Sequence, residues 1–144
     1  MKTKQLTEFK KLSELLTGFS SSGLVSTGLL KTYYWTTEKE LGSELFDSLL
    51  ENFSKLNIND PLQLTIRELS SVRDFLDHTI FKSYFPHITK LWYLGQWTDD
   101  DSGNNKIISS NSYLEGLVWK AIKAHPMGGK QPGFATWSFP PSSF

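Results

Sequence analysis

The residues of this sequence that could carry chemistry are a run of acids, three histidines and one glycine-rich stretch. The run from Asp99 to Asn105 is rich in the oxygen ligands that hard cations such as Ca²⁺ prefer. An EF-hand loop needs Gly at its sixth position and Glu at its twelfth, and neither a loop starting at Asp99 nor one starting at Asp100 supplies them. The run is therefore interpreted as a solvated turn, because Asp, Gly and Asn all suit turns.

The three histidines, His78, His87 and His125, lack the second histidine four residues along that a zinc-binding helix needs. His78 follows Asp74 and Asp77, which could orient it as a base, but the sequence indicates no nucleophile or metal to work with it. The pattern favours a surface histidine near a helix end.

The stretch Gly128-Gly129-Lys130 looks like part of a phosphate-binding loop. A Walker loop also needs an earlier Gly and a Ser or Thr after the Lys, whereas Gln131-Pro132 follows here. The chain has no Cys, which excludes disulfides, thiolate metal sites and Cys nucleophiles. We therefore expect that this chain is not itself an enzyme and holds neither a metal nor a cofactor.

Composition narrows the possible partners of the 144-residue chain. Hydrophobic residues make up 38% and aromatic residues 14%, which is enough for one core. Lys plus Arg and Asp plus Glu number 15 each, so the basic footprint of a nucleic-acid-binding protein is missing. No apolar run approaches the roughly 20 residues that span a bilayer, and no export signal is visible at the start.

Helical periodicity predicts the elements that position these residues. Caps mark three helix starts: Thr37 stands three residues before Glu40 and Ser112 three before Glu115, and Asp60-Pro61 pairs an N-cap with a first-turn proline. The sequence predicts an all-α fold, a small bundle of about five to six helices over residues 1–126, with an irregular Gly/Pro/aromatic tail at 127–144. The expected helices cover residues 6–17, 27–34, 38–55, 61–78, 85–94 and 112–124, with a short extended segment at 106–108.

Apolar side chains exceed what so small a bundle can bury. Trp119 and Tyr113 flank the core stripe of the last predicted helix, and the segment 91–97 is similarly rich. Two interpretations stay open: the tail folds back over the bundle, or these groups and the tail bind a partner. The partner interpretation assigns the interface to Trp92, Tyr93, Trp97, Trp119, Phe134 and Trp137.

The segment Leu91-Trp92-Tyr93-Leu94-Gly95 carries a resemblance to a known family. It is followed by a polar turn, the hydrophobic pair Ile107-Ile108, a helix with aromatics and a tail containing Pro132-Gly133-Phe134. This order resembles the small subunit of sugar dehydrogenase complexes, the family named for membrane-bound FAD-containing sorbitol dehydrogenase, which includes the small subunits of fructose and glucose dehydrogenases. The opening pattern from Phe9 to Gly18 is also similar to that family's first helix.

The resemblance implies a non-catalytic accessory subunit. Its partner would be a large flavoprotein of the glucose-methanol-choline type, which carries FAD and oxidises a sugar or polyol, with a cytochrome subunit as a further partner. Small subunits of this family assist folding and export of that partner by the twin-arginine route, which implies a periplasmic, membrane-associated complex. Because no twin-arginine signal is visible, a cytoplasmic location also stays open, and the alternative function is a stand-alone helical adaptor or regulator with an unrelated partner.

Overall fold

Short amphipathic helices make up most of the computed structural model, which describes residues 2–126 and 129. The chain divides into two compact units, residues 1–89 and 90–144, and each is described by itself. The predominantly helical character predicted from the sequence is confirmed, with more and shorter helices than expected and one small β-hairpin. The predicted boundary between a bundle and a tail at residue 126 stays a prediction.

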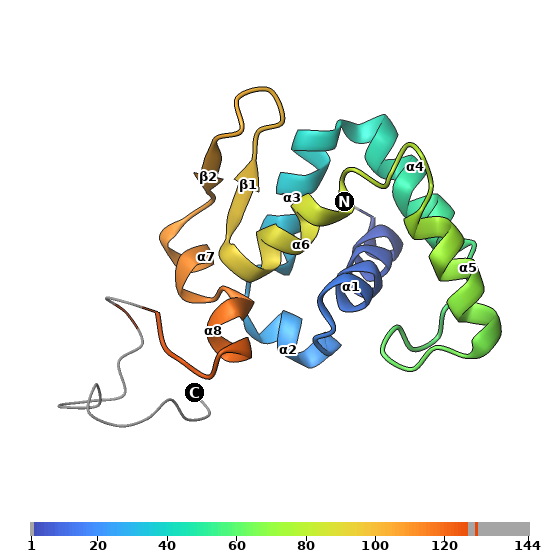
Figure 1. Ribbon diagram of the computed structural model, residues 1–144, viewed down its shortest axis with the longest axis horizontal. Helices are drawn as coiled ribbons and strands as arrows, with labels where there is room; N and C mark the ends of the chain where they lie inside the picture. The colour runs from blue at the N-terminus through green and yellow to red at the C-terminus, as the bar shows by residue number, and fades with distance from the viewer. Residues whose placement is uncertain (1, 127–128, 130–144) are drawn as a thin grey trace. The chain divides into compact units, whose positions relative to one another are not determined.

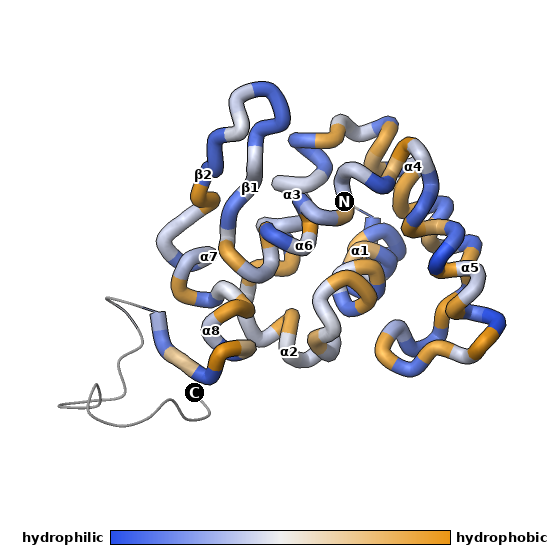
Figure 2. Tube along the Cα trace, viewed as in Figure 1, coloured by the Kyte–Doolittle hydropathy of each residue, from blue (hydrophilic) through white to orange (hydrophobic). Residues whose placement is uncertain are grey.

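The first unit is built from helices that pack around α1 (Figure 1). Helix α1 contacts α2, α3 and α4, and α3 also packs on α4. Figure 2 shows apolar and polar residues interleaved along α4 and α5, as expected of helices that bury one face. The elements of this unit are α1 (Thr3–Thr17), α2 (Ser21–Ser26), α3 (Leu30–Leu41), α4 (Ser43–Ser54), α5 (Ile66–Leu76) and the start of α6 (Phe85–Leu94).

Aromatic side chains form the centre of this unit. Phe9, Tyr34 and Phe46 meet edge to face, with ring centroids 4.9 to 5.9 Å apart. In a second group, Phe53 of α4 packs against Phe75 of α5 at 5.7 Å, which places these two helices side by side. Such pairs add about 0.5–1.5 kcal/mol each beyond the burial of their area.

The helix predicted over residues 38–55 is wrong in one respect, because Gly42 divides it into α3 and α4. Gly42 has φ +85°, a backbone conformation that favours glycine. Thr37 is not an N-cap: it lies inside α3, fully buried, and its hydroxyl donates to the Tyr33 carbonyl at 2.8 Å. The T-x-x-E spacing therefore occurs here within a helix.

The helix predicted over residues 61–78 begins later, at Ile66. Thr65 is its N-cap: the Thr65 hydroxyl accepts from the Glu68 N–H at 3.2 Å, and the Glu68 carboxylate accepts from the Thr65 N–H at 2.8 Å. The Asp60 carboxylate instead accepts from the Leu62 N–H at 3.0 Å and closes a turn. The prediction that Asp60-Pro61 starts this helix is therefore wrong, because Asp60 and Pro61 form a turn ahead of it.

The second unit contains the end of α6, a two-stranded antiparallel sheet and two short helices. Strands β1 (Gln96–Thr98) and β2 (Asn105–Ile107) pair with Trp97 opposite Lys106. The helix predicted over residues 112–124 is two helices, α7 (Ser110–Leu114) and α8 (Leu117–Ala121). Ser109, not Ser112, caps α7. In the described residues, no helix is both long enough and apolar enough to cross a membrane.

Candidate functional site

Gly95 joins three elements of the second unit. Its N–H donates to the Leu91 carbonyl and ends α6, and its carbonyl accepts from the Ile108 N–H at 3.0 Å and from the Ser112 hydroxyl at 3.2 Å. Gly95 has φ +66°, and a Cβ built there would lie 2.5 Å from the Ser112 carbonyl oxygen. No side chain fits at that distance from backbone, so the last residue of the Trp-Tyr-Leu-Gly segment must be glycine.

Ser112 holds the other side of this junction, and it is fully buried. Its hydroxyl accepts from the Ser109 N–H at 2.9 Å, while the Ser109 hydroxyl accepts from the Ser112 N–H at 3.0 Å. The same buried hydroxyl also lies 3.2 Å from the Gly95 carbonyl oxygen. The cap of α7 and the end of α6 are therefore held by one side chain.

The start of α8 is held against the end of α6 in the same way. A Cβ built on Gly116 would lie 2.7 Å from the Tyr93 carbonyl oxygen. The Trp119 indole N–H donates to the Tyr113 carbonyl at 2.9 Å, and the two rings meet edge to face at 5.6 Å. These contacts orient the Trp119 ring with its polar atom satisfied.

A polar cluster fastens the hairpin to α6. The Lys90 ammonium donates to Thr98 Oγ1 at 2.7 Å and to Asn105 Oδ1 at 2.6 Å, and the Thr98 hydroxyl also donates to Asn105 Oδ1 at 2.8 Å. The two bonded side chains stand directly opposite each other on β1 and β2. Lys90 therefore links α6 to both strands of the hairpin.

The structure places the predicted interface residues in two environments. Trp92 on α6 and Trp97 on β1 are 1% and 7% exposed, so these rings are covered within this chain and offer little surface to a partner. Tyr93 and Trp119 are half-buried and present part of their rings. Phe134 and Trp137 lie outside the described residues. The interface role of the set stays a prediction.

The chemistry-bearing residues weighed from the sequence have local structural partners. His78 Nδ1 accepts from the Ile80 N–H at 3.3 Å, its ring stacks on Phe81 at 4.8 Å, and Asp77 lies 3.8 Å from Lys82 instead. The Asp99 carboxylate accepts from the Asp101 N–H and the Ser102 hydroxyl and so closes the hairpin loop. Among residues 2–126 and 129, no group of three or more His, Asp or Glu side chains is placed to hold a metal.

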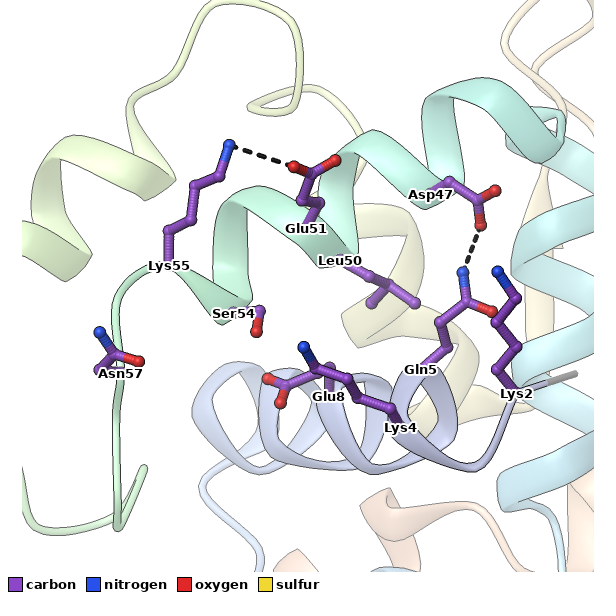
Figure 3. Close-up of a pocket in the computed structure, with 10 residues that line it drawn as sticks. All are labelled: Lys2, Lys4, Gln5, Glu8, Asp47, Leu50, Glu51, Ser54, Lys55 and Asn57. Carbon is purple, nitrogen blue, oxygen red and sulfur yellow. Dashed lines mark hydrogen bonds and ion pairs between the residues drawn. The ribbon is translucent and has the colours of Figure 1, made fainter.

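A groove of about 700 Å³ runs between α1 and α4 of the first unit (Figure 3). Gln5 Nε2 donates to Asp47 Oδ1 at 2.6 Å, and Lys55 lies 3.3 Å from Glu51 on α4. Ser54 is its one hydroxyl side chain, and the described residues give it no hydrogen bond to a base. The lining residues balance in charge: they are Lys2, Lys4, Gln5, Glu8, Asp47, Leu50, Glu51, Ser54, Lys55 and Asn57.

Tyr34 connects this groove to the aromatic core. Its ring is buried and its hydroxyl donates to Gln5 Oε1 at 3.4 Å. Burial raises the pKa of the Tyr34 phenol above its ordinary value of 10.0, and the nearby carboxylates of Glu38 and Asp47 raise it further. The phenol therefore stays neutral near pH 7 and acts as a donor, which is a structural role.

No pattern in the sequence predicts this groove, and none of its lining residues is among the predicted site residues. Gln5 and Asp47 stand 42 residues apart and contact each other only through the packing of α1 on α4. A contact between residues so far apart in the chain cannot be predicted from local spacing. The requirement for glycine at Gly95 also has no local signal, because it comes from the approach of Ser112, 17 residues along the chain.

Comparisons with family models, with curated proteins and with solved structures found no match to this chain.

Proposed function

We propose that this chain is a non-catalytic accessory subunit that binds, stabilises and assists the maturation and export of a large FAD-dependent sugar or polyol dehydrogenase of the glucose-methanol-choline type. The partner carries the FAD and the catalytic groups. The complex acts at the membrane surface of the periplasm, with a cytochrome subunit as a further component.

The observation that carries this proposal is the construction around Gly95. The segment Leu91 to Gly95 supplies the strongest part of the resemblance to sugar dehydrogenase small subunits. In the structure the same segment ends α6, and Gly95 has a backbone conformation and a close approach that only glycine accepts. The residues that carry the resemblance therefore belong to one structural unit. The fold constrains the sequence of this segment at Gly95.

The half-buried aromatics beside this junction support a binding role. Tyr93 and Trp119 each present part of a ring on short helices whose backbones are held together at Gly95 and Gly116. Rigid aromatic side chains of this type are the usual anchors of protein interfaces. A stand-alone adaptor with an unrelated partner would use the same anchors, and it is the second candidate function for that reason.

Co-purification tests the proposal. The tagged chain is expressed together with a large FAD-dependent dehydrogenase subunit of the glucose-methanol-choline type, and captured material is examined for the second polypeptide and for flavin absorbance. We expect a stoichiometric complex whose flavin belongs to the large subunit, and a purified single chain that is colourless and metal-free. A flavin band or stoichiometric metal in the isolated chain contradicts the non-catalytic role, and the absence of any complex favours the adaptor.

A double substitution then locates the anchors. Phe134→Ala with Trp137→Ala is expected to reduce recovery of the complex by more than about tenfold, because aromatic truncations at an interface cost on the order of 2 kcal/mol or more. The melting temperature of the isolated chain should stay the same. If the double variant unfolds the isolated chain while its folded fraction still assembles, these residues cover their own core.

A further inference from the structure

His78 holds the turn that connects α5 to α6. Its Nδ1 atom accepts a hydrogen bond from the Ile80 N–H at 3.3 Å. Its backbone carbonyl accepts from the Phe81 N–H at 3.1 Å and from the Lys82 N–H at 2.9 Å. One residue therefore binds three consecutive backbone donors, as an N-cap does at the start of a helix.

The ring of His78 also lies at the edge of the aromatic core. It stacks on Phe81, with ring centroids 4.8 Å apart and ring planes inclined by 25°. Phe81 is buried, and its ring centroid lies 6.1 Å from that of Phe75 on α5. The turn that His78 caps therefore carries a side chain of the core, and the stacking contact orients the imidazole for its bond to Ile80.

The bond to Ile80 exists only while Nδ1 carries no proton. A neutral imidazole has one donor and one acceptor nitrogen, so this bond assigns the ring proton to Nε2. In the imidazolium both nitrogens are donors, and Nδ1 then opposes the Ile80 N–H. Protonation of the ring therefore removes the capping bond and leaves the two bonds to the His78 carbonyl in place.

The charged groups around His78 come from α5, from the end of α4 and from the turn itself. Lys55 and Asp74 line the same hollow of about 370 Å³ as His78. Lys55 is paired at 3.3 Å with the glutamate four residues before it, and Lys82 lies 3.8 Å from Asp77. Asp74 has no ion pair within residues 2–126 and 129. Its carboxylate is therefore the acceptor that remains for an imidazolium in this hollow.

We propose that His78 is a pH-sensitive cap for the turn between α5 and α6. While the ring is neutral, Nδ1 holds the Ile80 N–H and the turn is ordered. When the ring is protonated, Nδ1 releases that N–H, the imidazolium turns toward the Asp74 carboxylate, and residues 78–82 loosen. The stabilisation is present while the ring is neutral and is lost as the pH falls and the ring takes up its proton. This inference goes beyond the proposed function and does not rest on it.

Exchange of backbone amides with water, measured by NMR on the full chain, tests the proposal. Protection factors correct for the intrinsic effect of pH on exchange, so a change that remains reports the structure. We expect protection of the Ile80 N–H to fall about fivefold between about pH 8 and about pH 5, which is the effect of one hydrogen bond. The Leu69 N–H, which donates to the Thr65 carbonyl at 2.9 Å within α5, should keep its protection.

Two substitutions at His78 separate the capping bond from the charge. His78→Asn supplies a side-chain oxygen that accepts from the N–H two residues on and does not titrate, so Ile80 should stay protected at both pH values. His78→Phe keeps a ring beside Phe81 but removes the acceptor, so protection of Ile80 should be about fivefold lower at both pH values. His87→Asn is the matched control, because it removes a histidine of the same unit that lies on α6. It should keep the pH dependence of the unchanged chain.

Three results would overturn the proposal. The first is protection at Ile80 that does not change with pH in the unchanged chain. The second is a pH dependence that persists in the His78 variants, because another group would then cause it. The third is loss of the pH dependence in His87→Asn. If one His78 variant fails to fold, the other still decides, since the pH dependence must disappear in both.

Discussion

Gly95→Ala is the substitution whose consequence the structure defines most sharply. The new methyl group would lie 2.5 Å from the Ser112 carbonyl oxygen and 2.9 Å from the Ser112 Cβ, both inside van der Waals contact. The residue would also keep φ +66°, where L-residues other than glycine are strained. Either Gly95 or the start of α7 must move, and the bonds from Ile108 and Ser112 to the Gly95 carbonyl lengthen with it.

The expected cost is the sum of three effects. The left-handed conformation costs an alanine about 1–2 kcal/mol. Overpacking against backbone costs about 1–3 kcal/mol. The two weakened hydrogen bonds together cost about 1 kcal/mol. Gly95→Ala should therefore lower the free energy of unfolding by about 3–6 kcal/mol, a large part of the 5–15 kcal/mol that small domains possess.

Gly103→Ala is the control within the same unit. Gly103 has φ +67°, almost the value of Gly95, but nothing lies within 4 Å of a Cβ built on it. Only the conformational strain of about 1–2 kcal/mol remains, and the stiffening of the unfolded chain by alanine is common to both variants. Urea unfolding followed by tryptophan fluorescence measures the stability of both variants, and the difference between them should be about 2–4 kcal/mol.

Equal destabilisation by the two variants would refute the reasoning. It would mean that α7 yields to the methyl group at no cost, and that the junction of α6, the hairpin and α7 is loose.

Two further predictions test single contacts. The folded state favours the neutral Tyr34 phenol, so the raised pKa stabilises the fold below pH 10.0, and that stabilisation is lost as the pH rises above this value. In urea unfolding at alkaline pH, Tyr34→Phe should therefore lose less stability than the unchanged chain. An equal loss in both chains would contradict the raised pKa of Tyr34. Lys90→Met removes both bonds from the ammonium to the hairpin and should cost about 1 kcal/mol, with faster hydrogen exchange at the Asp99 and Ile108 N–H groups. Unchanged exchange at both amides would show that the strand pairing alone holds the hairpin.

The sequence predicts a helix end correctly where a residue type at that position has a strong backbone preference. The helix predicted over residues 85–94 is α6, residue for residue, because Pro86 suits only a first turn and Gly95 ends the helix. The end of the first helix at Thr17 was likewise predicted from Gly18, which has φ +76°. In both places the stop signal is a backbone preference of a single residue type.

Caps were less predictable, because several residues offer the same short-range hydrogen bond. Thr37 has the spacing of a capping box but is buried in α3, while Thr65 forms the real box of α5. Ser109 and Ser112 both have hydroxyls near the start of α7, and Ser109 caps it while Ser112 is buried against Gly95. The position of a helix start depends on where the chain must turn to bury its apolar side chains. Tertiary packing therefore selects which of several nearby hydroxyls becomes the N-cap.

The sequence by itself determined the helical fold class, the stop signals and the segment that carries the resemblance. Only the tertiary structure decided that Trp92 and Trp97 are covered, that Gln5 meets Asp47 across a groove, and that Ile66 is left in solvent. The physical reason is the range of the forces involved. Helical periodicity and turn preferences act over three or four residues, whereas burial joins residues such as Gly95 and Ser112, 17 positions apart, that no local spacing connects.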